Sequence, residues 1–497
     1  MGVATREVVD AVIVGSGPNG LAAAIVLARA GLQVVVAEAQ HSLGGGMRTL
    51  DLGLAHGVTH DVCAAVHPLA LASPFFAEFE LAGRGVELVS PELAYAHPLP
   101  GGRAGLAYVD VDRTAAELGA DGPAWLELFA PLLEHWRDLS ALALSNRTAP
   151  AVRLLRELGP GVLARTGHRM LTQGTAAWRR TFAGDAAPAL LTGVAGHAIG
   201  PLPSPVAAGT MLMLGTLAHA GGWPIPIGGS GAISAALLAD LEAHGGQVRA
   251  GIPVRNWREL PRARAYLMDT SVPAVLQIWG ERMPHRVRRS LARVRPGPAA
   301  AKVDYVLRGP VPWSQPRVGE AATVHLGGSR EQMMASAAAT VAGRVASEPF
   351  VLFSDPVVAD PGREVGGLRP GWAYAHMPYD CPIDPVPIVT AQIERYAPGF
   401  SDLVVAARGV PANRMSEHNA NYGGGDIGLG ALRLASMVQR PRWALDPYST
   451  GIPGVYLCSA AASPGPGVHG MAGYWAARRA LADRFGRTTA VDLALSG

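Results

Sequence analysis

Apolar and polar positions near the N-terminus follow the periods of a strand, a helix and a second strand. The β-branched apolar run at residues 8–14 is typical of a buried parallel strand. Residues 15–20 have the spacing G-x-G-x-x-G, and an Ala/Leu-rich helix is expected from about residue 21 to 30. A second strand is expected at residues 33–37. This order of elements predicts a dinucleotide-binding βαβ unit.

Each glycine of the turn has a physical role in such a unit. Gly15 permits the tight turn, Gly17 lets a pyrophosphate approach the backbone, and Gly20 lets the helix pack closely on the strand. The start of the helix supplies free N–H groups and a partial positive charge. Glu38, at the end of the second strand, is placed to accept hydrogen bonds from an adenosine ribose. A glycine turn without a ligand is the alternative, and the complete context favours a bound dinucleotide.

The rest of the chain shows helical periods first and strand periods later. Residues 113–180 are helical by period, which predicts either a cap with its own core or a cover over an apolar substrate site. The apolar stretch 206–220 is too short to span a membrane and predicts a buried helix that lines a pocket. A helix at residues 388–396 flanks the later part, whose strands are expected at residues 302–307, 323–326, 351–354 and 372–376.

The length of 497 residues favours two domains over one. We expect an α/β fold in which a Rossmann-like cofactor domain is formed by residues 1–95, 222–265 and 450–497. A discontinuous substrate domain, with a mixed sheet and a helical cap, is expected from residues 96–221 and 266–449.

Composition removes several classes of function. A net charge of +3 gives no case for nucleic-acid binding. Three widely spaced cysteines argue against structural zinc and a redox disulfide, and no metal site is predicted. The first strand begins too near Met1 for a signal peptide, so a cytoplasmic location is expected. Six arginines within residues 282–295 indicate a solvated helix face, and a peripheral membrane contact is the alternative.

A second glycine cluster indicates which dinucleotide binds. Residues 44–49, Gly-Gly-Gly-Met-Arg-Thr, place an arginine just after the ribose acid. This pattern resembles the glutathione-reductase-type FAD proteins, in which a glycine doublet and a basic residue line the flavin diphosphate, so the expected cofactor is FAD. Near the C-terminus, a strand at 454–457 precedes a helix at 471–481. Free N–H groups at the start of this helix could stabilise the N1–C2=O edge of a reduced flavin.

With the motifs GSGPNGLAAAIVLARAG, GGGMRT, KVDYVLRGPVPW and SPGPGVHGMAGYWAARRAL, the chain resembles the phytoene desaturase and carotenoid isomerase group of FAD proteins. The nearest set is a bacterial phytoene-dehydrogenase-like branch. The resemblance implies hydride transfer from a small apolar, isoprenoid or lipid-like substrate to flavin N5, with oxygen or a quinone as electron acceptor. The cofactor-binding residues that it and the fingerprint predict are Gly15, Gly17, Pro18, Asn19, Gly20, Glu38, Ala39, Gly45, Gly46, Met47, Arg48, Val254, Ala461, Val468, Gly470 and Met471.

Three residues are candidates for catalysis: His469, Lys302 and Asp304. In related amine oxidases a lysine holds a water at flavin N5, and this role would suit Lys302. The alternatives are an exposed salt bridge between Lys302 and Asp304, and a His469 that caps its helix. Three other functions stay open: a redox-neutral flavin-dependent isomerase, amine or imine oxidation, and a non-catalytic flavin-fold scaffold.

Overall fold

The N-terminal apolar run forms the central strand of a five-stranded parallel sheet. In the computed structural model, which describes residues 7–146, 149–172, 180–433, 440–444 and 446–495, β1 (Ala11–Val14) pairs with β2 (Val34–Ala37) and β10 (Ala265–Met268). Strands β9 (Gln247–Arg249) and β16 (Val455–Leu457) complete the order β16-β10-β1-β2-β9. Three segments that are far apart in the chain therefore build one sheet, as the Rossmann-like prediction requires.

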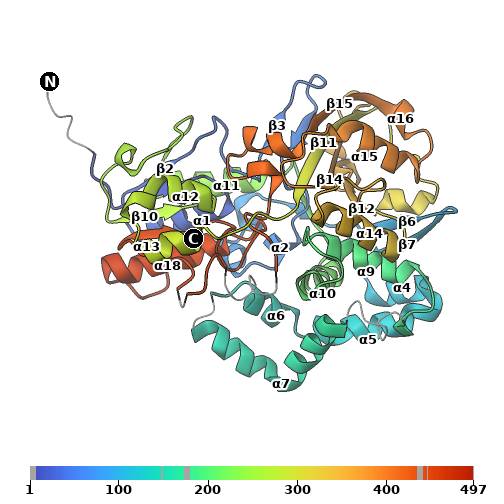
Figure 1. Cartoon of the computed structure of the whole chain (residues 1–497), viewed down its shortest axis with the longest axis horizontal. Helices are drawn as coiled ribbons and strands as arrows, with labels where there is room; N and C mark the ends of the chain where they lie inside the picture. The colour runs from blue at the N-terminus through green and yellow to red at the C-terminus, as the bar shows by residue number, and fades with distance from the viewer. Residues whose placement is uncertain (1–6, 147–148, 173–179, 434–439, 445, 496–497) are drawn as a thin grey trace.

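Helices α11 (Gly231–Ala243) and α18 (Met471–Phe485) both pack against α1 (Pro18–Arg29) beside this sheet (Figure 1). Every residue of α1 from Asn19 to Ala28 is buried, because the helix is small and apolar on all sides. Helix α18 crosses it closely, since a Cβ at Gly473 would lie 1.7 Å from the Asn19 carbonyl oxygen. The C-terminal segment is thereby fixed against the start of α1.

A second, seven-stranded sheet has the order β15-β11-β14-β13-β12-β6-β7. Only the pair β6–β12 is parallel, so the sheet is mixed. The four strands expected after residue 299 are present, whereas the sequence did not predict β6, β7 and β15. The strands are β6 (Leu93–Leu99), β7 (Arg103–Tyr108), β11 (Ala299–Leu307), β12 (Thr323–Leu326), β13 (Val351–Ser354), β14 (Arg369–Met377) and β15 (Val404–Val410).

The two faces of this sheet differ in chemistry. Val303 and Tyr305 of β11 face an apolar core shared with α15 (Pro385–Glu394) and α16 (Phe400–Leu403). The alternate positions Lys302 and Asp304 lie on the opposite face and are also buried. We call the face that carries Lys302 and Asp304 the polar face. Ala300, Leu352 and Tyr374 form an apolar patch on it, and neither face is open to solvent at these positions.

A group of helices packs against the seven-stranded sheet near β6, β7 and β12. Helices α9 and α10 contact the sheet, while α5, α6 and α7 form a layer beyond them (Figure 1). The expected helical cap is confirmed, and with it the predicted fold class. These helices are α4 (Val111–Glu117), α5 (Gly122–Leu133), α6 (Trp136–Ala143), α7 (Ala149–Thr172, broken at Gly159), α9 (Ala186–Gly196) and α10 (Pro205–Ala220).

Shorter elements connect these layers. None of the helices in the described ranges is long and apolar enough to cross a membrane. The short strands are β3 (Thr49–Asp51), β4 (Thr59–Asp61), β5 (Leu88–Val89) and β8 (Ile225–Pro226), and the other helices are α2 (Pro68–Leu71), α3 (Pro74–Phe79), α12 (Val272–Trp279), α13 (His285–Leu291) and α14 (Arg330–Val341).

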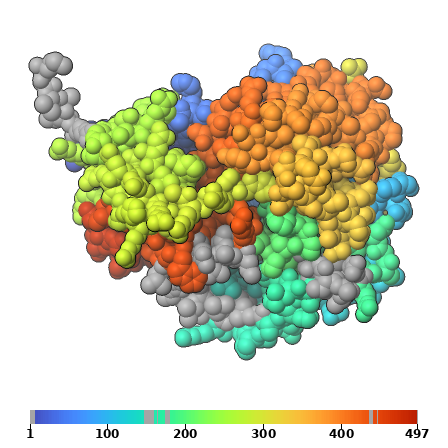
Figure 2. Space-filling model, in the orientation of Figure 1, coloured from blue at the N-terminus to red at the C-terminus, as the bar shows by residue number. Residues whose placement is uncertain are grey.

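The apolar cores show where the predicted domain boundaries fall. The boundary at 95/96 lies inside β6, and the boundary at 265/266 lies at the first residue of β10. Helices α12 and α13 pack into the core of the five-stranded sheet through Val272 and Leu291. Figure 2 shows the segment near residues 250–290 on one side of the visible face and the segment near 330–430 on the other.

The six arginines of residues 282–295 are exposed. Their exposure suits both a solvated face and a peripheral membrane contact.

Candidate cofactor and active site

One cavity of about 1240 Å³ extends from the glycine turn after β1 to the polar face of the seven-stranded sheet. Gly17 and Glu38 line one end, and Thr323 and Trp372 line the other. The wall between them is mainly apolar and includes residues of α10 such as Leu212. The prediction that residues 206–220 form a buried, pocket-lining helix is confirmed. A single space can therefore hold an extended cofactor and a substrate next to each other.

Only glycine fits at two positions of the turn. Gly15 has φ +102°, and a Cβ there would lie 2.6 Å from the Asp269 carbonyl oxygen. A Cβ at Gly20 would lie 2.1 Å from the Gly15 carbonyl oxygen. These contacts are the tight turn and the close helix–strand packing that the fingerprint predicts.

Glu38 is buried at the rim of the same turn. Its Oε2 accepts hydrogen bonds from the Ser16 N–H and hydroxyl, each at 2.8 Å, and its Oε1 accepts one from the Gln40 N–H at 2.9 Å. The carboxylate is thereby fixed beside the cavity, and Oε1 retains capacity for a further donor. This geometry suits a ribose hydroxyl.

Arg48 places a buried positive charge next to the two glycine clusters. Its guanidinium donates to the Gly45 carbonyl at 2.7 Å, to the Ser42 hydroxyl at 2.9 Å and to the His418 carbonyl. All three acceptors are neutral, and burial lowers the pKa of Arg48. A Cβ at Gly45 would lie 2.7 Å from the Gly17 Cα, so the two clusters touch. A cavity-lining cation with only neutral partners fits a diphosphate.

Asp269 is a component of this site that the sequence analysis missed. It follows β10, lines the cavity, and its Oδ2 accepts the Gly20 N–H at 2.8 Å. Burial, and then the charge of Glu38, raises the pKa of Asp269 to about 7. Its position at the end of a strand next to β1 is the signal that could have identified it, because parallel strands end at one sheet edge.

We expect Asp269→Asn to stabilise the protein, and to do so more as the pH rises. Between about pH 4 and 7 the unfolded carboxyl ionises while the folded one keeps its proton, so the wild type loses stability, at most about 1.4 kcal/mol per pH unit. The asparagine cannot ionise and avoids this loss. Thermal unfolding at pH 5, 6, 7 and 8 should show a difference in Tm that grows to pH 7 and then levels off. A difference that is independent of pH would contradict the shifted pKa.

His469 is placed as a helix cap. Its Nδ1 accepts the Met471 N–H at 3.0 Å, so Nε2 carries the proton and donates to the Gly465 carbonyl oxygen at 3.1 Å. Burial lowers the pKa of His469 to about 4, which keeps the ring neutral at pH 7. The residue lines the cavity, but both ring nitrogens have protein partners.

The start of α18 offers fewer free amides than the sequence suggested. The Met471 N–H is taken by His469, and the Ala472 N–H donates to Asn19 Oδ1 at 3.2 Å. The expectation of free N–H groups is therefore wrong for these two positions.

Lys302 and Asp304 form a salt bridge, but it is buried rather than exposed. Lys302 Nζ lies 2.5 Å from Asp304 Oδ1 and 2.9 Å from the Asp61 carbonyl oxygen. The two side chains are 4% and 3% exposed, so the predicted exposed pair is wrong in its environment. Neither residue lines the cavity that contains His469. Their catalytic role stays a prediction.

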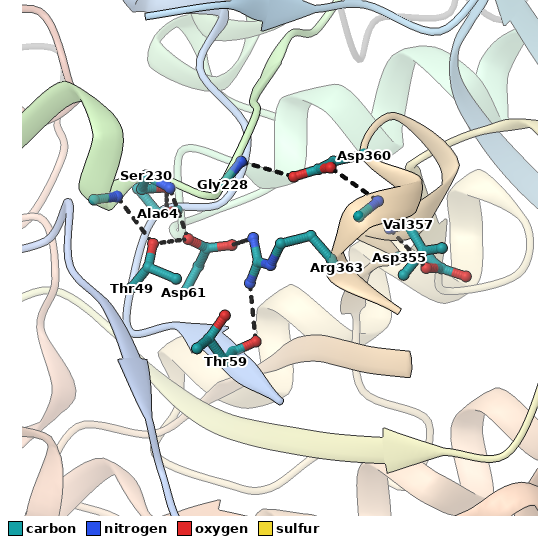
Figure 3. Close-up of polar contacts among 12 residues, drawn as sticks. Thr49, Thr59, Asp61, Ala64, Gly228, Ser230, Asp355, Val357, Asp360 and Arg363 are labelled. Atoms are coloured by element: carbon teal, nitrogen blue, oxygen red, sulfur yellow. Dashed lines mark hydrogen bonds and ion pairs between the residues drawn. The ribbon is translucent and has the colours of Figure 1, made fainter. Parts of the chain in front are cut away.

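The carbonyl of Asp61 accepts a hydrogen bond from the Lys302 ammonium, and the carboxylate of Asp61 belongs to a larger polar network. Figure 3 shows the contacts of that carboxylate. The carboxylate accepts from the Thr49 hydroxyl at 2.7 Å and the Ser230 N–H at 2.8 Å, and it pairs with Arg363 Nη1 at 3.1 Å. A parallel contact links the Gly228 N–H to Asp360 at 2.7 Å. The network connects β3, β4 and the start of α11 to the substrate side of the chain.

The predicted cofactor-binding residues divide into two sets. Within the described residues, Gly20, Met47, Ala461, Gly470 and Met471 do not line the cavity, and no group of three or more His, Cys, Asp and Glu side chains is placed to hold a metal ion. The predicted residues that line it are Gly15, Gly17, Pro18, Asn19, Glu38, Ala39, Gly45, Gly46, Arg48, Val254 and Val468.

Comparisons of sequence place the chain near known oxidoreductases. Residues 13–79 match the family described as NAD(P)-binding Rossmann-like domain. The rat pyridine nucleotide-disulfide oxidoreductase domain-containing protein 2 is 24% identical over 571 aligned residues, which cover 95% of this chain and 93% of the rat protein. One subunit of the limonene dehydrogenase of Castellaniella defragrans is 25% identical over 131 residues, 26% of this chain and 23% of that subunit.

Comparison of structures gives the fold of the whole chain. Wild-type putrescine oxidase bound to putrescine superposes with a TM-score of 0.56 at 17% identity, covering 97% of this chain and 99% of the oxidase. The chain therefore shares the fold of putrescine oxidase, with a Rossmann-like domain and a second, multi-stranded sheet.

Proposed function

We propose that the protein is an FAD-dependent oxidoreductase of the phytoene-dehydrogenase-like kind, acting on a small apolar, isoprenoid or lipid-like substrate. The observation that carries this proposal is the continuous cavity, which joins the dinucleotide turn to an apolar chamber beside α10. A bound flavin would accept a hydride from a substrate C–H bond. Oxygen or a quinone would then take the electrons.

The residues that would hold FAD follow from the donor set. Glu38 would accept hydrogen bonds from the adenosine ribose, because it lines the cavity and its Oε1 accepts only the Gln40 N–H among the described residues. Arg48 and the turn at Gly17 would bind the diphosphate, since a buried cation and close backbone approach meet there. Val468 and His469, at the other side of the cavity, would contact the isoalloxazine.

The substrate chamber supports an apolar ligand. Leu212 and Met213 of α10, with Leu139 and Leu142 near α6, line it and would exclude water from the reacting bond. The similarity to part of a limonene dehydrogenase, whose name gives an isoprenoid hydrocarbon, supports the same class. The exposed arginines of residues 282–295 suit a peripheral contact with an anionic membrane, from which such a substrate could be drawn.

Amine oxidation is the second candidate, because the fold is shared with putrescine oxidase. A carboxylate with spare capacity would be one partner for an ammonium group, and in the described lining the acidic residues are Glu38, Asp269 and Asp426. Glu38 and Asp269 lie at the glycine turn. Asp426 already accepts the N–H groups of Gly297, Gly428 and Gly430. These contacts favour the apolar substrate.

The visible spectrum of the purified protein tests the proposal. Bound oxidised FAD is expected to give bands near ~370 and ~450 nm. Anaerobic incubation with a lipid extract, but not with putrescine, should bleach them. Bleaching by putrescine would favour amine oxidation. Bands that persist with both would favour the isomerase or scaffold alternatives, and a colourless protein that takes up no added FAD would contradict the cofactor assignment.

A further inference from the structure

The polar face of the seven-stranded sheet closes the substrate end of the cavity with a row of three side chains. Thr323 of β12 pairs in register with Ser354 of β13, and Ser354 pairs with Trp372 of β14. Paired positions on neighbouring strands project from the same face. Thr323 and Trp372 line the cavity. Ser354 lies between them in the sheet and does not itself line the cavity. We call these three residues the polar row.

The polar row is buried and has no hydrogen-bond partner. Thr323, Ser354 and Trp372 are 1%, 0% and 8% exposed. Thr323 Oγ1, Ser354 Oγ and Trp372 Nε1 each lack a partner in the described part of the chain. Buried polar groups in folded proteins are almost always satisfied. Two of these groups, on Thr323 and Trp372, stand unsatisfied at the wall of the cavity, where a ligand would complete them.

The donor set restricts the chemistry of that ligand. The indole N–H can only donate, and the two hydroxyls can donate or accept. The ligand must therefore supply an acceptor. Asp304 pairs in register with Trp372, and its charge is matched by Lys302 at 2.5 Å. The carboxylate of Asp304 beside this row disfavours an anion, which favours a neutral oxygen as the acceptor.

We propose that the polar row binds a carbonyl or alcohol oxygen of an otherwise apolar substrate, whose hydrocarbon lies against α10. This inference rests on the proposed function and narrows its substrate class from a hydrocarbon to an uncharged oxygenated lipid-like molecule. A pure hydrocarbon would fill the apolar chamber and leave the polar row unsatisfied.

Two probes with the same carbon skeleton test the inference: limonene, a hydrocarbon, and carvone, its ketone analogue. Isothermal titration calorimetry on the purified holoprotein gives the Kd of each. Thr323→Val keeps the shape of the side chain and removes the hydroxyl. We expect it to weaken carvone binding by roughly 5- to 10-fold and to leave limonene binding unchanged. Trp372→Phe is the second variant and removes the indole N–H. The ratio of the Kd for carvone to the Kd for limonene should rise in this variant, as in Thr323→Val.

Thr323→Ser is the matched control, because it keeps a hydroxyl at the same position of β12. Its ratio of the two Kd values should stay close to that of the wild type. Equal effects of Thr323→Val on both probes, the same change in this ratio for Thr323→Ser as for Thr323→Val, or a cavity that binds neither probe would overturn the inference. The visible absorbance of each sample reports its flavin content, so a failed cofactor assignment is distinguished from a failed substrate contact.

Discussion

Replacing Arg363 by methionine is expected to destabilise the protein by about 3–5 kcal/mol, because it leaves the buried Asp61 carboxylate without its cation. The two side chains are 4% and 2% exposed, and Nη1 and Oδ2 lie 3.1 Å apart. Arg363 also donates from Nη2 to the Thr59 carbonyl at 2.9 Å, and this bond is lost as well. Differential scanning calorimetry should show a large fall in Tm.

Two further variants make this prediction specific. Arg363→Met combined with Asp61→Asn removes both charges and keeps an amide that can bond to Thr49 and Ser230, so it should recover much of the loss. Arg414→Met breaks the exposed pair Arg414–Glu417 and should change Tm little. If Arg363→Met lowers Tm as little as Arg414→Met does, the buried pair Arg363–Asp61 does not stabilise the protein and the prediction is wrong.

The βαβ unit could be predicted because its signals are local. Strand, glycine turn, helix and acid follow within about 30 residues, which is the span of one such unit, and the structure places β1, α1 and β2 within one or a few residues of the expected bounds. Strand β6 was missed because residues 91–106 are rich in proline and glycine, which are typical of loops. It pairs along most of its length with β7, the next strand in the sequence, and it joins the rest of the sheet through β12, which lies far away in the sequence.

The polar face shows a second limit of sequence reasoning. Alternation along residues 302–307 predicted that Lys302 and Asp304 share a face, and they do. It could not predict that this face is buried, because burial depends on β14, β15 and the helices that cover the sheet. An exposed salt bridge was therefore the natural expectation, and it was wrong. Thr323 and Trp372 were missed for the same reason, since only the pairing of the strands places them beside one cavity.

Lys302→Met is the other substitution with a large expected effect. It leaves Asp304 buried without a cation and the Asp61 carbonyl without its donor, so we expect a loss of about 3–5 kcal/mol. Methionine has nearly the length of lysine and fills the same space, which limits any cavity term. Calorimetry on the variant should show a fall in Tm comparable to that of Arg363→Met.

The double variant Lys302→Met/Asp304→Leu separates a structural role of the lysine from a catalytic one. With both charges of the buried pair removed, stability should return toward that of the wild type. If Lys302 acts only through packing and charge, the double variant should regain the wild-type rate of anaerobic flavin bleaching together with the wild-type Tm. If Lys302 instead holds a reacting water, the double variant should regain the Tm but not the rate of flavin bleaching. Because Lys302 bonds to Asp304 and Asp61 and does not line the cavity, we expect stability and rate to recover together.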